Sequence, residues 1–137
     1  MLRLAAKDTE DLAIISAHMQ DALVRLADIR FLKRPRKFAL VANRFAWEER
    51  PKSERRRTGL HLEHVLSVRQ SGLGDTSGEM TLSLLSITFE DGAAPSGTVV
   101  LTFSAGHSIR LEVEYLDLQL KDLGAAWATE FTPAHGD

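Results

Sequence analysis

Hydrophobic residues change their spacing twice along the chain, and the pattern predicts a helix, then a run of strands, then a second helix. Near the N-terminus, Leu12, Ile15 and Met19 recur at intervals of three and four residues, the spacing of one helix face. Asp8 precedes this stretch as a candidate N-cap, and acidic residues follow in the first turn, where they complement the helix dipole. The pattern therefore predicts a helix over residues 9–19 with its apolar stripe against the core.

Between the two helices, apolar and polar residues alternate, which is the period of strands with one buried face. The alternation predicts six strands, at residues 22–32, 37–47, 60–70, 79–90, 98–104 and 107–115. The apolar positions change parity near Asp28 and again after Leu84, so a β-bulge is expected in the first and in the fourth strand. The last two strands are expected to pair antiparallel, with Ile109, Leu111 and Val113 buried.

The segment after the last strand returns to helical spacing. Leu116, Leu120 and Leu123 share one face, and Gly124 is a candidate C-terminal cap, so Asp122 is expected to be an ordinary charge on the helix surface. No helix separates the strands, so neighbouring strands are expected to pair as hairpins. The sequence thus predicts an α+β fold: a curved antiparallel meander of about six strands with an N-terminal helix and a short C-terminal helix. This element order is that of a pleckstrin-homology-like barrel; a sandwich of helices on an antiparallel sheet is the alternative.

Length and composition indicate one domain. The chain has 137 residues, of which 26% are charged and 44% hydrophobic, as in ordinary globular domains. We expect a single domain over residues 1–132, with Trp127 and Phe131 anchoring its end, and a disordered tail over residues 133–137. The longest apolar run, residues 38–42, is far shorter than the ~20 residues of a spanning helix, and no signal peptide is recognisable. We therefore expect a cytoplasmic protein.

Charge is distributed unevenly along the chain. The 17 basic and 19 acidic residues give a net charge of −2, yet residues 30–57 hold eleven basic and three acidic residues, or +8. Such segregation indicates an anionic partner. Two clusters are the candidate sites: a proline turn with Lys33, Arg34, Arg36 and Lys37, and a polar, mobile loop that ends in Arg55, Arg56 and Arg57. A strand of about 33 Å separates them, so they are not expected to form one patch. The alternative is that these basic residues only keep the hairpin ends soluble.

The chain holds no recognisable catalytic or cofactor motif. The glycines fit neither a phosphate-binding loop nor a nucleophile elbow, and the absence of cysteine excludes thiol chemistry and cysteine-type zinc sites. His61 and Glu63 share one face of a predicted strand, and His107 could join them only from a turn. His64 lies on the opposite, apolar face, where a hydrogen-bonded core histidine is expected. We therefore expect no metal and no cofactor.

Six segments together resemble one known family. They are Leu40-Val-Ala-Asn-Arg-Phe-Ala-Trp-Glu48, Arg57-Thr-Gly-Leu-His61, Val65-Leu-Ser-Val68, Leu82-Ser-Leu-Leu-Ser-Ile87, Ile109-Arg-Leu-Glu-Val-Glu114 and Leu120-Lys-Asp-Leu-Gly124. From Leu2 to Trp127 the chain resembles the small alphaproteobacterial proteins grouped as domain-of-unknown-function family 2948. The resemblance implies a stand-alone, cytoplasmic, single-domain bacterial protein, and it implies no activity and no catalytic residues.

These observations favour a non-enzymatic binding or adaptor domain that recognises a protein or another anionic partner. An acidic protein surface, RNA and an anionic lipid headgroup would each fit the two basic clusters. Two alternatives remain open from the sequence. One is an enzyme whose site is built from His61, Glu63 and His107 or from residues that only the fold brings together. The other is an RNA-binding accessory protein.

Overall fold

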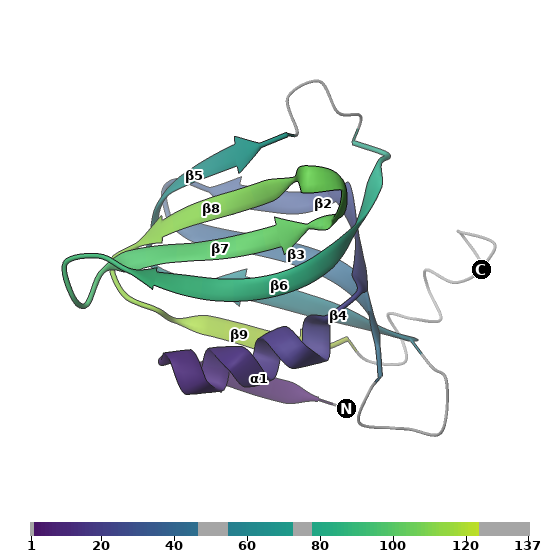
Figure 1. The fold of residues 1–137 in the computed structure, drawn as a ribbon, viewed down its shortest axis with the longest axis horizontal. Helices are drawn as coiled ribbons and strands as arrows, with labels where there is room; N and C mark the ends of the chain where they lie inside the picture. Colours follow the sequence, from purple (N-terminus) through teal and green to yellow (C-terminus); the bar gives the residue numbers. More distant parts are fainter. Residues whose placement is uncertain (1, 47–54, 73–77, 124–137) are drawn as a thin grey trace.

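A single antiparallel sheet dominates the computed structural model, which describes residues 2–46, 55–72 and 78–123 (Figure 1). Within these ranges the elements are β1 (Arg3–Ala6), α1 (Thr9–Met19), β2 (Ala22–Leu32), β3 (Lys37–Phe45), β4 (Arg55–Leu62), β5 (Val65–Ser71), β6 (Thr81–Asp91), β7 (Gly97–Phe103), a 3-10 turn (Ser104–Gly106), β8 (Ser108–Val113) and β9 (Leu118–Asp122). The nine strands lie in the order β1-β9-β4-β3-β2-β6-β7-β8-β5.

The sheet curls so that its two halves face each other. In Figure 1, β6, β7 and β8 lie in front of β2, β3 and β4, and α1 crosses below them. Strand β2 belongs to both halves, because Val24 is opposite Ala42 of β3 and Leu82 of β6. The space between the halves is filled by buried apolar side chains, among them Phe38, Leu40, Leu60, Leu84, Leu101, Phe103, Leu111 and Leu120. Because the core lies between the two halves, polar residues and any binding site are expected on the outer surfaces of the halves.

The predicted fold class, a six-stranded meander with two helices, is wrong. Leu118–Asp122 is strand β9 and not part of a C-terminal helix, so the pleckstrin-homology-like outline also fails. The predicted strand over residues 60–70 breaks at His64, whose φ is +59°, and its two parts, β4 and β5, join different halves of the sheet. Two short strands, β1 and β9, which are the first and last strands of the described residues, pair with each other and extend the sheet.

The reasons for these errors are local. A separation of four residues, as between Leu116 and Leu120, fits one helix face and equally one strand face, and the buried positions of β9 alternate with exposed ones. Strand β4 begins at Arg55 inside the predicted loop because its backbone pairs with β3 from Phe45 onward, despite three consecutive arginines. Pairing between strands overrides local polarity here.

Several local predictions are confirmed. The helix spans Thr9–Met19, and the side chain of Asp8 accepts a hydrogen bond from the backbone N–H of Asp11 at 2.8 Å. Strands β7 and β8 pair antiparallel, and the three apolar side chains predicted to be buried in β8 are buried. Both bulges occur, as register shifts within residues 24–29 of β2 and 84–86 of β6. No helix among the described residues has the length and apolarity to cross a membrane.

Three predictions concern residues outside the described ranges: the domain end at residue 132, the tail over residues 133–137, and the anchoring by Trp127 and Phe131. The predicted strand 37–47 ends in the structure at Phe45.

The bulge in β2 opens the outer surface of the sheet. Between the pairs Val24–Ala42 and Ile29–Leu40, four residues of β2 stand against one residue of β3, Val41. These residues of β2 do not pair with β3. They run instead beside the segment that precedes β6, where the N–H of Ala27 donates to the carbonyl of Gly78 at 2.8 Å. Val41 therefore has no regular neighbour from β2, and a hollow forms beside it.

Candidate anion-binding groove

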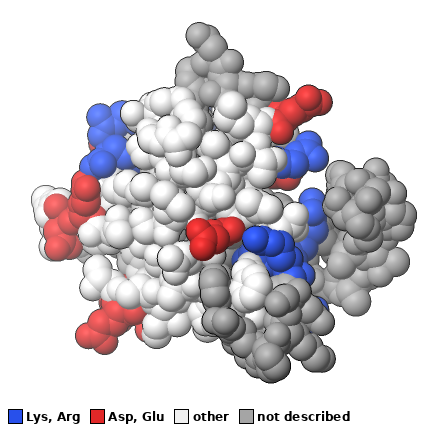
Figure 2. Space-filling model, turned by 45° about the vertical axis from the view of Figure 1, so that its right-hand side comes forward, with Lys and Arg blue, Asp and Glu red and all other residues white. Residues whose placement is uncertain are grey.

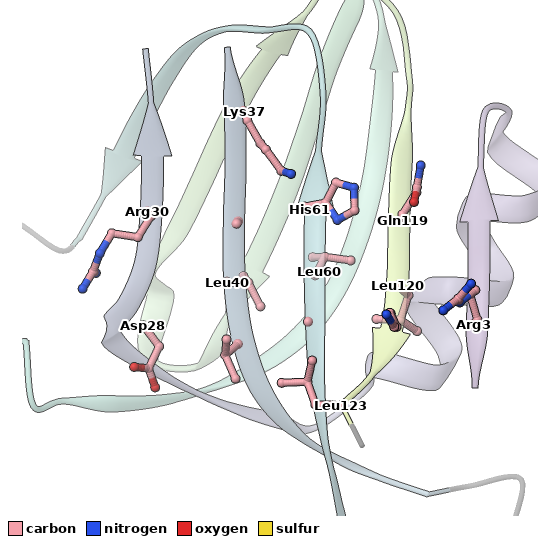
Figure 3. Close-up of a pocket in the computed structure, with 14 residues that line it drawn as sticks. Arg3, Asp28, Arg30, Lys37, Leu40, Leu60, His61, Gln119, Leu120 and Leu123 are labelled. Carbon is pink, nitrogen blue, oxygen red and sulfur yellow. The ribbon is translucent and has the colours of Figure 1, made fainter. Parts of the chain in front are cut away.

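A groove of about 560 Å³ lies on the outer surface of the half-sheet formed by β1, β9, β4, β3 and β2 (Figure 3). Its size falls within the range of small-molecule sites in proteins. Its floor is formed by Ala39, Val41 and Gly59, of which Gly59 has no side chain and Ala39 only a methyl group. Basic and hydrogen-bonding side chains line its sides: Arg3, Arg30, Lys37, His61, Gln119 and Lys121.

Strand alternation and register produce this groove. Phe38 and Leu40 face the core, so Ala39 and Val41 face outward between them. Ala39 stands opposite His61, and Val41 stands opposite Gly59. Three small outward residues on two paired strands leave a depression where larger side chains would form a continuous surface.

Gly59 is not required by backbone strain or by crowding. A Cβ atom added there would meet Leu123 Cδ2 at 3.8 Å and the Lys121 carbonyl oxygen at 3.9 Å, both ordinary contacts. A side chain at this position would instead project into the groove. Gly59 therefore offers a place where the groove can be filled without changing its charge.

Two like charges face each other at one corner of the groove. Arg3 of β1 and Lys121 of β9 are directly opposite in the antiparallel register, and both are exposed. Directly opposed residues have Cβ atoms roughly 4.5–5.5 Å apart, and like charges in this arrangement destabilise a sheet. Among the described residues, neither side chain forms a hydrogen bond or an ion pair. An anion between them would relieve this repulsion.

The other two basic side chains that line the groove, Lys37 and Arg30, already have partners within the protein. Lys37 Nζ lies 3.7 Å from Glu63 Oε2, and the guanidinium of Arg30 donates to the backbone carbonyls of Ala27 and Ile29. In Figure 3 the Lys37 side chain extends toward His61, whereas Arg30 points away from the middle strands. The available positive charge is therefore concentrated at the Arg3–Lys121 corner.

His61 lies within this charged environment. Burial lowers the pKa of His61, and the nearby Lys37 ammonium lowers it further, while Glu63 and Asp117 act in the opposite direction. His61 Nε2 is 3.7 Å from Glu63 Oε2, and across the strands its neighbour is Gln119. A neutral imidazole of this kind can donate one hydrogen bond and accept another.

A second hollow of about 270 Å³ adjoins the groove and shares Asp28 and Val41 with it. It extends toward Arg25, Asn43 and Arg57, and an Arg57 nitrogen, Nη1, lies 3.5 Å from Asn43 Oδ1. Among the described residues that line either hollow, Asp28 is the one acidic residue. The outer surface is thus positive around both hollows.

The structure separates the two predicted basic clusters. Lys33, Arg34 and Arg36 lie in the β2–β3 turn, at the opposite end of β3 from Arg55, which pairs with Phe45. Lys37 lines the groove from the turn side, and Arg57 lines the adjoining hollow. On the face shown in Figure 2, Lys and Arg side chains stand in separate groups with acidic side chains beside them, and they form no continuous patch.

Most of these side chains already make contacts. Arg36 Nη1 is 2.7 Å from Glu114 Oε1, and Arg55 Nη1 donates to the carbonyl of Asn43 at 3.1 Å. Arg56 also has a partner. Anion binding by the two clusters stays a prediction. Of their residues, Lys37 lines the groove and Arg57 lines the adjoining hollow, so the prediction is best supported for these two.

The proposed triad of His61, Glu63 and His107 does not assemble. His61 and Glu63 are adjacent on β4, as predicted, whereas His107 follows the turn after β7 in the other half of the sheet. The prediction that His64 lies in the core is wrong: it occupies the β4–β5 turn and its Nε2 is 2.6 Å from the Tyr115 hydroxyl. No group of three or more His, Asp or Glu within the described ranges is placed to hold a metal ion.

Asp122 is buried and not on a helix surface, which corrects the sequence prediction. Its carboxylate accepts hydrogen bonds from Arg44 Nε at 2.9 Å and Nη2 at 2.7 Å, from the Thr58 hydroxyl at 2.8 Å and from the Leu2 N–H at 3.0 Å. Arg44 and Asp122 are 0% and 1% exposed. Burial raises the pKa of Asp122, but the hydrogen bonds from Arg44, Leu2 and Thr58 outweigh it, so the net pKa is lowered. Asp122 of β9 thus contacts Arg44 of β3, Thr58 of β4 and Leu2, the residue before β1.

Sequence reasoning missed Arg3 and Lys121. The segment around Arg3 is four residues long, and the segment around Lys121 was assigned to a helix, which hides its strand neighbours. The alternation of Leu2, Leu4 and Ala6 could have indicated a strand with Arg3 on its outer face.

One family model matches the chain: it is described as "Protein of unknown function (DUF2948)" and covers residues 2–135. No curated protein and no solved structure gives a significant match.

Proposed function

Since this chain belongs to the DUF2948 family of proteins of unknown function, whose description assigns no activity, we propose from the chain's own geometry that it is a non-enzymatic binding domain. Its ligand or partner carries an anionic group, and the groove on the outer surface of β1, β9, β4 and β3 receives that group. This keeps the function predicted from the charge distribution but moves the site from the two basic clusters, residues 33–37 and 55–57, to the groove, which of these residues only Lys37 lines.

The observation that carries the proposal is the opposition of Arg3 and Lys121. Two exposed like charges directly opposite each other on neighbouring strands destabilise a sheet. The arrangement becomes favourable when an anion lies between them, because each cation then has a counter-charge. The concave floor beside the pair gives such an anion a place to bind.

Two features favour binding over catalysis. Asp122 has a perturbed pKa, but its two carboxylate oxygens are occupied by Arg44, Thr58 and Leu2 and are shielded from solvent. Among the described residues that line the groove, the one carboxylate, Asp28, and the one imidazole, His61, come from β2 and β4 and lie apart, so the lining offers no general acid and base as a pair (Figure 3). Its polar side chains are suited to holding charge and forming hydrogen bonds.

Isothermal titration calorimetry with inorganic pyrophosphate tests the proposal. The double variant Arg3→Ser, Lys121→Ser is expected to bind roughly tenfold more weakly than the parent, since two exposed charge contacts of ~0.7 kcal/mol each amount to about 1.4 kcal/mol. The affinity of the parent should also fall as salt is raised, because exposed charges are screened.

The matched control is Lys33→Ser, Arg34→Ser, which removes two exposed cations from the β2–β3 turn. It is expected to bind as the parent does. If the control loses affinity and the groove variant does not, the turn is the site and the proposal is wrong. If the parent binds no pyrophosphate even at low salt, the groove does not recognise anions.

A further inference from the structure

We infer that the ligand of the groove is a nucleoside phosphate: a compact phosphate group joined to a flat heterocyclic ring. The inference rests on the proposed anion-binding function and specifies its ligand class. It follows from where the available charge lies, from the nature of the floor and from the polar groups at the opposite side.

The charge pattern favours one compact anionic group over a polymer. A nucleic-acid backbone would need several available cations spaced along its path. In the groove, Lys37 is paired with Glu63, and Arg30 donates to carbonyls of its own strand. Arg3 and Lys121, by contrast, meet at one corner. Their arrangement fits a single phosphate or diphosphate.

The floor favours a flat apolar group beside that anion. Ala39, Val41 and Gly59 are neighbours on two paired strands, so together they form one apolar surface with little side-chain bulk. Gly59 stands opposite Lys121 and Val41 stands opposite Gly59, so the floor begins directly beside the basic corner. A ring attached to a phosphate at the corner would lie across these three residues.

The polar groups along the next row match the edge of a heterocycle. His61 and Gln119 stand opposite each other, and His61 is also opposite Ala39 on the floor. Gln119 offers both a donor and an acceptor, and so does a neutral imidazole. On the far side, Asp28 adds an acceptor from the β2 bulge. Ring nitrogens and exocyclic amino groups would find partners along this row, whereas a simple anion would not use it.

The inference is tested by calorimetric titration of the full chain with four probes: inorganic pyrophosphate, adenosine, ADP and a ten-nucleotide RNA. ADP is expected to bind at least tenfold more tightly than either pyrophosphate or adenosine, because it alone contacts both the corner and the floor. Gly59→Val, which fills the floor with a residue suited to strands, is expected to reduce ADP binding at least tenfold, to the level of pyrophosphate, and to weaken pyrophosphate binding far less, because both cations of the corner stay in place.

Gly59→Ala keeps the test decisive if the valine variant does not fold. Its added methyl group makes only the ordinary contact of 3.8 Å with Leu123, and a smaller loss of ADP affinity, about threefold, is expected. Thr88→Val, at an exposed position of β6, is the matched control and should bind ADP as the parent does.

The outcomes distinguish the two proposals. If pyrophosphate binds and ADP binds no more tightly, the nucleoside phosphate is ruled out while the anion-binding function stands. If RNA binds far more tightly than ADP and Gly59→Val leaves RNA binding unchanged, the ligand is a polymer and the inference is wrong. If neither pyrophosphate nor ADP binds, both proposals fail.

Discussion

The buried pair of Arg44 and Asp122 allows the sharpest prediction on stability. Replacing Asp122 by Ala removes the acceptor of four hydrogen bonds and leaves the Arg44 guanidinium, 0% exposed, without its carboxylate. Removal of one partner of a buried ion pair costs about 3–5 kcal/mol. For a domain of this size, ~1 kcal/mol corresponds to roughly 3–4 °C in Tm, so a decrease of about 10–20 °C is expected.

Urea unfolding followed by circular dichroism measures the effect, with the free energy obtained from the midpoint and slope. The control is Asp91→Asn, an exposed carboxylate at the end of β6, which should change stability by less than ~0.5 kcal/mol. The double variant Arg44→Met, Asp122→Leu should recover most of the loss, because it removes both charges together. A cost below ~1 kcal/mol for Asp122→Ala would show that the buried pair is not what joins these strands.

The same pair sets a dependence on acid. The pKa of Asp122 is lowered in the folded protein, so its stabilising contribution is present above the unfolded-state pKa of ~3.9 and is lost as pH falls through the folded-state pKa. The parent is therefore expected to lose stability below about pH 4 more steeply than Asp122→Asn, measured as the unfolding midpoint in urea between pH 5 and pH 2. Equal slopes would contradict this assignment.

Three further predictions concern the core, a strand glycine and the groove. Leu111→Ala should cost ~2–5 kcal/mol, and a thermal melt lowered by less than about 2 °C would refute its place in the core. Gly97→Ala should destabilise by ~1–3 kcal/mol in urea, because a Cβ there would approach the Glu90 carbonyl oxygen to 2.6 Å; an unchanged midpoint would contradict this crowding. Since burial and Lys37 lower the pKa of His61, an anion in the groove should raise it again, so the ratio of ADP affinity in the parent to that in His61→Gln should increase from pH 8 to pH 6, a ratio in which protonation of the ADP phosphate cancels. Glu63 and Asp117, which also face the ring, limit the size of this effect, and His61→Gln should show a weaker pH dependence than the parent.

The sequence predicted the fold correctly where the spacing of apolar residues fits only a helix or only a strand. The helix after Asp8 and the strand with Ile109, Leu111 and Val113 have unambiguous spacing, and the structure has both. The bulge near Asp28 was visible because a change of parity in a strand requires an extra residue. Leu116 and Leu120 allowed two interpretations, and only the pairing with β1 and β4 decides for a strand.

The candidate site was only partly predictable for a different reason. Lys37 and Arg57 lie in a stretch of high positive charge, so composition alone indicated them. Arg3 and Lys121 are isolated cations in sequence, and their significance arises from a register that brings residues 3 and 121 opposite each other. The floor residues Ala39, Val41 and Gly59 are ordinary in sequence as well; their absence of bulk matters only once two strands are placed side by side.

The pairing of β1 with β9 also has a consequence for folding kinetics. It brings together segments about 120 residues apart, and the Leu2 N–H to Asp122 bond spans the same separation. Closing so long a loop is slow relative to forming the hairpins between them, so we expect this pair to form after the folding transition state. A ligand held by Arg3 and Lys121 would then slow unfolding while leaving the folding rate unchanged, which stopped-flow measurements with and without ADP can resolve. The basic corner would exist only in chains where β1 and β9 have paired, so partly folded chains would not compete for its ligand.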